Sequence, residues 1–245
     1  MHHFYSVIIG TELLNGRRVD KHFTFLNQTL RKRNLLHVGN FVIQDDKEQI
    51  EACFKMILND PKSVMFCFGG LGATPDDLTR AIASDVFTAR PLVLHVKAKE
   101  LIIAQFGKEA YPHRISMAML PPQAQLLHNV VNQVPGFSLE NRFFFTPGFP
   151  SMAWPMVIEA LDRYFSDEVP SFKDAFIVES SENDLIEIME AIPKELHFSS
   201  LPRFVGEKRI VEIYFEHTNK ELVETWSHFF RDACIAKGKA IKDCL

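Results

Sequence analysis

The sequence predicts an α/β fold in three layers, a parallel-type sheet with helices on both faces, followed by a small α+β domain. Short apolar runs alternate with amphipathic segments from residue 4 to residue 164, which is the order of strands and helices in such a fold. The run Val64 to Phe68 is apolar at every position, as in a strand buried on both faces of a parallel sheet. With 47% of its 245 residues apolar, the chain has enough hydrophobic side chains for the core of one or two domains.

The spacing of apolar residues predicts the elements of the first domain in order. Strands are expected where apolar residues form short runs, and helices where they recur every three or four positions. Leu78, Ile82 and Val86, for example, are four residues apart and follow the loop GGLGATP. The expected strands are 4–9, 38–43, 64–68, 92–96 and 143–145, and the expected helices include residues 19–30, 50–58, 78–86, 99–106 and 151–164.

A second, smaller domain is expected after the segment FSDEVPS, which follows Tyr164 and is interpreted as a linker. The domains are therefore predicted at 1–165 and 170–245. The second has the β-α-β-β-α order of a KH-type module, but its 10 basic and 16 acidic side chains over 166–245 and its lack of a G-x-x-G loop argue against RNA binding. Its expected strands are 175–178, 197–199 and 210–215, and its expected helices lie near 184–191 and 220–236.

Composition excludes several classes of function. The 27 basic and 31 acidic residues give a net charge of −4, which provides no general attraction to nucleic acid or to an anionic membrane. The longest nearly uninterrupted apolar run, 64–73, is about half the length that spans a bilayer. The start MHHFYSVIIG lacks a basic region and a cleavage site, so we expect a cytoplasmic protein. The cysteines and histidines have no metal-ligand spacing, so any metal site would use oxygen ligands.

The loop GGLGATPDDLT, directly after the buried strand, is the expected phosphate-binding site. Gly69, Gly70 and Gly72 would expose backbone N–H groups where a phosphate can approach without meeting a Cβ atom. Thr79 would add a hydroxyl contact. The loop lacks the lysine of a P-loop, and Pro75 interrupts the pattern G-x-G-x-x-G, so the standard nucleotide loops are disfavoured.

The same loop carries the signals of a helix start. Thr74 is a suitable N-cap, Pro75 fits the first helical position, and Asp77 would complete a capping box. Asp76 and Asp77 either complement the helix dipole alone or hold a divalent cation that bridges to phosphate oxygens. Because two carboxylates would repel a bare phosphate, Asp76 and Asp77 are the expected metal ligands and catalytic residues.

Four sequence blocks resemble one known family. They are GTELL at 10–14, GGLGATPDDLT at 69–79, VPGF at 134–137 preceded by Asn129, and PGFPSMAWPM at 147–156. Together they resemble, in order and approximate spacing, the molybdopterin-binding-like domain at the N-terminus of the CinA competence- and damage-inducible proteins. The β-α-β-β-α tail is similar to the KH-type domain that follows in those proteins.

The resemblance implies a nucleotide- or pterin-sized cleft and a metal-dependent pyrophosphatase activity on ADP-ribose-like dinucleotides, with Mg²⁺, Mn²⁺ or Co²⁺ as cofactor. Related domains bind molybdopterin, so a non-catalytic molybdopterin- or nucleotide-binding protein is the alternative, and a regulatory partner of DNA uptake or repair comes third. Full-length CinA proteins also carry a C-terminal amidohydrolase domain. This chain stops near the point where that domain would begin, so deamidation is not expected of it.

The resemblance also assigns roles to loop residues at the strand ends. Glu12 is expected to bind metal or orient the attacking water, against the alternative of a solvated loop acid. Asn15 either contacts ribose or phosphate or forms a turn with Gly16, and Asn129 either caps its own loop or lines the cleft. The expected nucleotide- and phosphate-binding residues are Thr11, Asn15, Gly69, Gly70, Gly72, Thr74, Thr79, Asn129, Pro147, Gly148 and Pro150.

Further residues near these loops are weaker candidates. Asp45 and Asp46 end the second strand and would reach the crevice, while Arg17 and Arg18 are either solvated or contribute to diphosphate binding. Phe149, where the family often has proline, would narrow the pocket or stack on a base. The expected partner is a nucleotide or pterin small molecule, with no nucleic acid and no membrane. A homodimer is an open alternative to a monomer.

Overall fold

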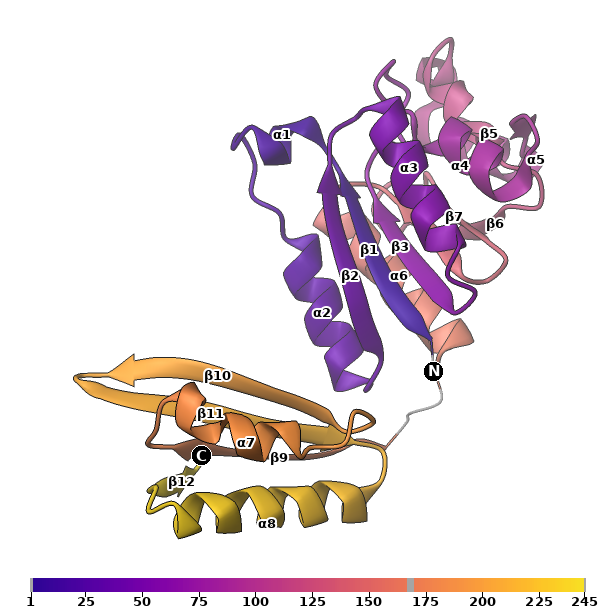
Figure 1. The fold of residues 1–245 in the computed structure, drawn as a ribbon. Helices are drawn as coiled ribbons and strands as arrows, with labels where there is room; N and C mark the ends of the chain where they lie inside the picture. The colour runs from indigo at the N-terminus through magenta and orange to yellow at the C-terminus, as the bar shows by residue number, and fades with distance from the viewer. Residues whose placement is uncertain (1, 167–169, 245) are drawn as a thin grey trace. The chain divides into compact units, whose positions relative to one another are not determined.

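The computed structural model describes residues 2–166 and 170–244. The chain divides into two compact units, 1–168 and 169–245, each with its own core (Figure 1). Residues 167–169 of the predicted linker lie outside the described residues. In the part of the chain that the structure describes, no helix is long and apolar enough to cross a membrane. The cytoplasmic location stays a prediction.

The first unit is built on a six-stranded sheet with the order β2-β1-β3-β8-β7-β6. The four strands at one side pair in parallel, whereas β7 and β6 are antiparallel to their neighbours. The expectation of a parallel sheet is therefore right for β2, β1, β3 and β8, and the sheet as a whole is mixed. The strands are β1 (His3–Ile9), β2 (Leu36–Ile43), β3 (Ser63–Phe68), β6 (Gln125–Leu127), β7 (Gly136–Leu139) and β8 (Phe143–Thr146).

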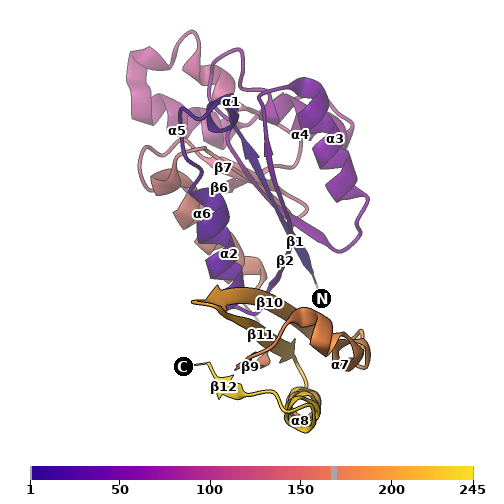
Figure 2. The ribbon, with the colours of Figure 1, turned by 60° about the vertical axis from the view of Figure 1, so that its left-hand side comes forward.

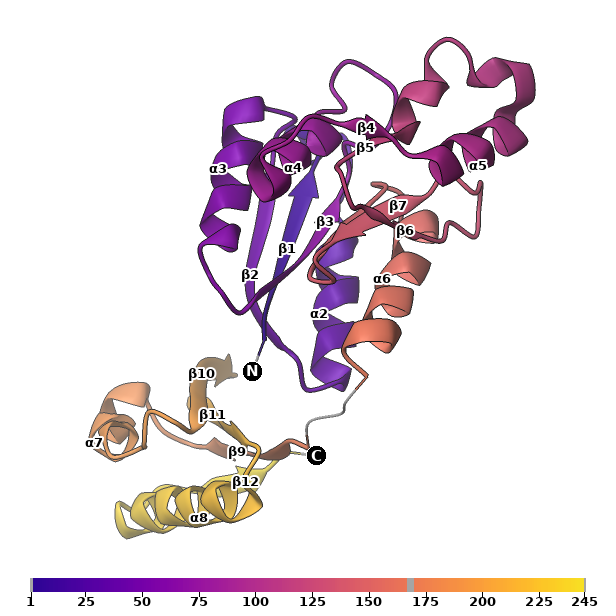
Figure 3. The ribbon, with the colours of Figure 1, turned by 90° about the vertical axis from the view of Figure 1, so that its right-hand side faces the viewer.

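Helices cover both faces of this sheet, so the three predicted layers are present (Figure 3). Successive side chains of β1 alternate between the faces: Val7 packs in the core under α3 and α4, and Ile8 in the core under α2 and α6. All six residues of β3 are buried, as its apolar run predicts. The helices are α1 (Thr11–Leu14), α2 (His22–Lys32), α3 (Lys47–Leu58), α4 (Thr79–Thr88), α5 (Val96–Phe106) and α6 (Pro150–Tyr164).

The segment 92–96 differs from its prediction as a full strand. It contributes β4 (Val93–Leu94), which pairs antiparallel with β5 (Met119–Leu120) in a separate two-stranded sheet. His95 ends the run because its Nδ1 accepts a hydrogen bond from the backbone N–H of Ala98 at 3.2 Å and so caps α5. Two 3₁₀ turns, Gly107–Ala110 and Arg114–Ala118, connect α5 to β5.

The second unit is an antiparallel sheet with the order β10-β11-β9-β12, together with a short and a long helix (Figure 2). Strand β9 pairs with residues 211–217 of β11, so residues 208–210 of β11 pair with β10 alone. The sheet contains a fourth strand, β12, that was not predicted, and the KH-type assignment stays a prediction. The elements are β9 (Phe172–Val178), the 3₁₀ turn Glu182–Leu185, α7 (Ile186–Glu190), β10 (His197–Val205), β11 (Lys208–His217), α8 (Lys220–Ala236) and β12 (Ile241–Asp243).

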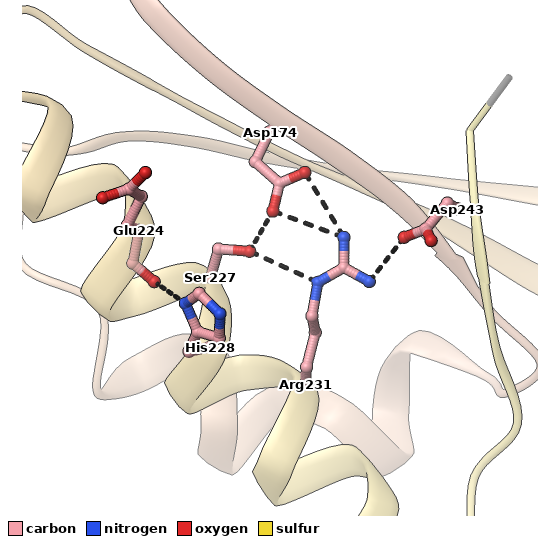
Figure 4. Close-up of polar contacts among 6 residues, drawn as sticks. All are labelled: Asp174, Glu224, Ser227, His228, Arg231 and Asp243. Carbon is pink, nitrogen blue, oxygen red and sulfur yellow. Dashed lines mark hydrogen bonds and ion pairs between the residues drawn. The ribbon is translucent and has the colours of Figure 1, made fainter.

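A polar cluster joins α8 to this sheet (Figure 4). Arg231 donates to both carboxylate oxygens of Asp174 at 3.3 Å and to Asp243 at 2.7 Å, and Ser227 donates to Asp174. The Arg231 guanidinium also lies 3.9 Å from the centroid of the Phe176 ring. Because its charge is paired with two carboxylates, this arginine acts as a structural tie between α8, β9 and β12.

Candidate functional site

Three loops gather at the carboxyl ends of the parallel strands. The chain leaves β1 through α2 to reach β2 on one side, and β3 lies on the other side of β1, so the strand order changes direction there. Open α/β sheets bind ligands in the crevice at such a point. The backbone N–H of Gly69 donates to the carbonyl of Thr146 at 3.0 Å, which holds the loops after β3 and β8 together.

The loop after β3 depends on its first two glycines for its shape. Gly69 and Gly70 have φ values of +103° and +67°. A Cβ atom on Gly69 would lie 2.3 Å from the carbonyl oxygen of Ile9, and one on Gly70 would lie 2.1 Å from Oγ1 of Thr79. These glycines therefore allow the chain to approach itself closely, which is a structural reason for their lack of side chains besides the predicted approach of a phosphate.

The predicted helix start at Thr74 is wrong, because α4 begins at Thr79. The carboxylate of Asp77 accepts the N–H of Gly72 at 2.7 Å, the N–H of Thr74 at 2.8 Å and the hydroxyl of Thr74 at 2.5 Å. The Thr74–Asp77 pair thus interacts, as a capping box would, but it closes a turn ahead of the helix. Residues 74–78 are held in this turn, and Pro75 is not in the first helical position.

Several backbone N–H groups of the loop have no partner among the residues that the structure describes. The amides of Gly69 and Gly72 are used within the protein, whereas those of Gly70, Leu71 and Ala73 donate no hydrogen bond to a residue that the structure describes. Unpaired N–H groups at the end of a strand are the donors that phosphate oxygens accept from.

Arg80 places a positive charge at this loop and was missed at the sequence level. It is 8% exposed, donates to the carbonyl of Leu71, and its Nε has no partner among the described residues. Burial lowers the pKa of Arg80, and the nearby Asp77 partly opposes the shift. A charged group buried next to unpaired amides favours an anion at the loop. No sequence signal distinguishes this arginine from an ordinary helix residue.

The two acids of the loop have different surroundings. Asp76 is exposed, and the pKa of its carboxyl is lowered by the Thr74 hydroxyl and by its own backbone N–H, so it is ionised at neutral pH. Asp77 is largely committed to the loop by its three hydrogen bonds. Of the two expected metal ligands, Asp76 is the one whose carboxylate is open to an ion.

A preformed metal cage is absent from the described part of the chain, where no group of three or more His, Cys, Asp or Glu side chains is placed to hold an ion. Mg²⁺ commonly keeps several waters and binds one or two carboxylates together with substrate phosphates. The residues present fit that mode, with Asp76 as the open ligand, and do not fit a dedicated site.

In the loop after β1, most predicted residues bond to the protein itself. The N–H and hydroxyl of Thr11 both donate to Asp45, at 2.8 and 3.0 Å, and Asp46 caps α3 by accepting the N–H of Gln49 at 3.0 Å. Asn15 accepts from the backbone N–H and Nε of Arg17 at 3.2 Å, which is a turn contact. These side chains hold the loop in place.

Buried polar residues of the predicted set are also satisfied internally. Asn129 is 1% exposed, donates to Val134 and Asn132 at 2.8 and 2.7 Å, and accepts from the N–H of Val131, so it caps its own loop. Thr79 is fully buried and donates to the carbonyl of Gly69. Both side chains thus use their polar groups in hydrogen bonds within the protein.

A cavity of about 230 Å³ opens between the loops after β1 and β8. The ends of β1 and β3 form its apolar wall, and Glu12, Arg18 and His22 contribute polar groups. Glu12 forms an ion pair with Arg18 at 3.5 Å. Gly148 and Pro150 of the predicted set line the cavity, but the glycine-loop residues 69–79 do not.

Pro147 and Phe149 belong to the same turn without lining the cavity. Phe149 precedes α6, and its carbonyl accepts the N–H groups of Met152 and Ala153, both at 2.9 Å. Its ring is 51% exposed and has the Arg18 guanidinium 5.2 Å from its centroid. This stacking ties the turn after β8 to the loop after β1.

Comparisons with known proteins agree with a three-layer α/β protein of the molybdopterin-binding class. Residues 6–167 match the family described as "Probable molybdopterin binding domain", and the chain belongs to this family. It is 33% identical over 151 residues to a CinA-like protein of Acaryochloris marina, covering 59% of this chain and 36% of that protein. A CinA-like protein of Rippkaea orientalis is 27% identical over 222 residues, covering 87% and 48%.

A solved structure supports the same relationship. The protein CinA from Thermoplasma acidophilum, described as of unknown function, aligns with a TM-score of 0.59 and 25% identity over 66% of this chain and 96% of that one. The resemblance to CinA proteins is thus confirmed. The chain spans less than half the length of the curated relatives named above.

Proposed function

We propose that the first unit binds the diphosphate of an ADP-ribose-like nucleotide at the loop after β3 and hydrolyses it with the help of a divalent ion. The observation that carries the proposal is the group of amides at Gly70, Leu71 and Ala73, which have no hydrogen-bond partner in the described part of the chain, beside the buried charge of Arg80. Hydrogen-bond donors fixed in this way stabilise charge that develops on phosphoryl oxygens.

In the proposed reaction, the oxygen of a water molecule attacks one phosphorus and the bridging P–O bond breaks, giving AMP and ribose 5-phosphate. The loop amides and Arg80 hold the phosphate oxygens, and Glu12 accepts the proton of the attacking water. Asp76, with Asp77 as a weaker candidate, would hold Mg²⁺, Mn²⁺ or Co²⁺, which supplies polarisation of the phosphoryl oxygens when bound.

A second candidate is a non-catalytic binding protein for molybdopterin or a nucleotide. It is favoured by the internal use of Thr11, Asp45 and Asp77 and by the ion pair of Glu12 with Arg18, which leave few carboxylates of the described loops free to act on a water molecule. Binding requires the same amides and arginine but no activated water. A homodimer is retained as part of either proposal.

The two candidates are separated by incubating the protein with ADP-ribose and each of the three ions and measuring AMP. Hydrolysis predicts ion-dependent AMP formation that is lost in Asp76→Asn and kept in Asp85→Asn, whose side chain lies exposed on α4. Binding of ADP-ribose or molybdopterin without AMP would establish the second candidate. Absence of both binding and turnover would reject the phosphate site.

A further inference from the structure

Helix α8 has two rows of mostly apolar residues, and the first of them packs in the core of the second unit. Its fully buried residues recur every three or four positions, as on the inner face of an amphipathic helix. They are Val223, Ser227, Phe230 and Cys234. This row faces the sheet, because the ring of Phe230 meets that of Phe176 on β9 edge to face, with centroids 5.9 Å apart.

The second row, here called the outer row, lies directly beside the first, and none of its residues is fully buried. It consists of Leu222, Trp226, Phe229, Ala233 and Ala236. The spacings of four, three, four and three are those with which one helix packs lengthwise against another. Phe229 is 41% exposed and its ring meets that of Trp226 edge to face, with centroids 5.1 Å apart. Figure 2 shows α8 nearly end-on against one face of the sheet.

The unpaired charges that border the outer row are acidic. Glu221 and Asp232 each come one residue before a member of the row, are exposed, and form no ion pair with a residue that the structure describes. The cations of the helix are used, since Lys220 pairs with Glu224 at 3.2 Å and Arg231 pairs with two carboxylates. Residues 166–245 contain 10 basic and 16 acidic side chains, so the outer row belongs to an acidic unit.

This charge pattern discriminates among the surfaces that could cover an apolar helix face. An anionic membrane would be repelled by the same carboxylates. A second copy of the chain would bring one acidic unit against another, which is also unfavourable. A helix with basic residues beside its own apolar row has the complementary charge and would bury the exposed rings of α8.

We propose that the outer row of α8 is a docking site for a basic amphipathic helix of a partner protein. Trp226 and Phe229 supply the apolar contact, since aromatic residues contribute much of the affinity at such interfaces. Glu221 and Asp232 pair with lysine or arginine at the border and favour a basic partner over an acidic one. The inference concerns the second unit and does not depend on the function proposed for the first.

The test uses the fluorescence of Trp226 in the full chain. The sequence has two tryptophans, and Trp154→Phe leaves Trp226 as the single tryptophan. The probe is a synthetic helix of about five turns with leucines at coiled-coil spacing and lysines beside them. A twin peptide has glutamate at every lysine position. We expect the lysine peptide to shift Trp226 emission to shorter wavelength in a saturable way, and the glutamate peptide to bind about 10-fold more weakly.

Two sets of substitutions separate the apolar contact from the charges. Phe229→Ser should weaken binding of the lysine peptide about 10-fold, whereas Phe204→Ser, which changes an exposed phenylalanine of β10, should leave it unchanged. Glu221→Gln combined with Asp232→Asn should weaken binding about threefold at low salt and reduce its salt dependence. Glu207→Gln is the control for charge, since Glu207 is exposed in the turn after β10. Circular dichroism of each variant checks that the fold is kept.

Several outcomes would overturn the inference. Among them are equal binding of the two peptides, no response of Trp226 to the lysine peptide, and equal binding by wild type and Phe229→Ser. A dimer of the wild-type chain in sedimentation velocity that Phe229→Ser abolishes would assign the outer row to a second copy instead. A shift of Trp226 emission with phosphatidylcholine vesicles but not with the lysine peptide would assign it to a lipid surface. Binding that is unchanged by loss of the two carboxylates would reject the basic partner.

Discussion

The glycine loop and the cavity between the loops after β1 and β8 both lie at the strand ends, but their polar groups differ in how they are paired. In the loop, the conspicuous carboxylate of Asp77 is bonded to three donors of the loop itself. Beside the cavity, the buried His22 keeps an Nδ1 atom that has no hydrogen-bond partner among the described residues. Satisfied groups hold the shape of the loop, whereas an unpaired buried atom lowers the stability of the fold.

The largest effect is expected from the backbone of the loop. Gly69→Ala would place Cβ 2.3 Å from the carbonyl of Ile9 at a positive φ, and should destabilise the first unit by about 3 kcal/mol or more. Gly16→Ala is the matched control, since Gly16 also has a positive φ but no atom within 4 Å of the added Cβ. Urea unfolding of both variants measures the difference, and equal losses would contradict the close approach of loop and strand.

A smaller effect separates the two acids. Asp77→Ala removes the acceptor of three hydrogen bonds and should lower the free energy of unfolding by about 2 kcal/mol. Asp76→Ala should leave stability nearly unchanged while removing ion-dependent turnover, because Asp76 is exposed. If both variants fold as well as wild type and lose turnover equally, the hydrogen bonds of Asp77 do not stabilise the loop and its role is the same as that of Asp76.

Replacement of the buried cation tests the phosphate end. Arg80→Met should reduce the affinity for pyrophosphate about 10-fold and weaken its salt dependence. Stability should fall by only about 1 kcal/mol, because the lost hydrogen bond to the Leu71 carbonyl is offset by removal of a buried charge whose Nε has no partner among the described residues. Arg90→Met provides the control, since Arg90 is exposed. Calorimetry across a salt series decides, and unchanged affinity would assign Arg80 to the loop structure alone.

The smallest effect concerns pH. The pKa of His22 in the folded protein is below its unfolded value of about 6.5, so the unfolded chain binds the proton more readily. Its contribution to stability is complete above that value and is lost as the pH falls toward the folded pKa. Arg18 adds to the lowering, while Asp20 and the Gly148 carbonyl oppose it.

His22→Asn should therefore flatten the decline in stability below pH 6.5 without abolishing it, because His37 titrates in the same direction. Thermal unfolding between pH 5 and pH 7.5 gives the two profiles. A decline as steep in the variant as in wild type would show that His22 is not buried as a neutral ring.

Much of the first unit was predictable because its signals are local. The apolar run at 64–68 corresponds to β3 (Ser63–Phe68), and the spacing at 151–164 corresponds to α6 (Pro150–Tyr164). The antiparallel strands β6 and β7 were not predicted, since they have three and four residues and too little pattern to recognise.

The candidate site was harder to predict because its chemistry depends on which groups form hydrogen bonds with each other. The pattern Thr74-x-x-Asp77 correctly paired two side chains but did not reveal that the pair closes a turn before α4. Nothing in the sequence indicates that Asn27 reaches His37 and that no described residue reaches Nδ1 of His22. Hydrogen-bond partners are set by tertiary packing, which a single sequence does not reveal.

The outer end of the β10–β11 ribbon has a consequence for motion in the second unit. Residues 203–205 and 208–210 pair with each other alone, and Phe204 and Val205 at its tip are 73% and 61% exposed. A two-stranded ribbon without a packed face is marginally stable in water. Amide hydrogens there should exchange with solvent long before those of β9, by fraying of the tip while the rest of the sheet stays closed.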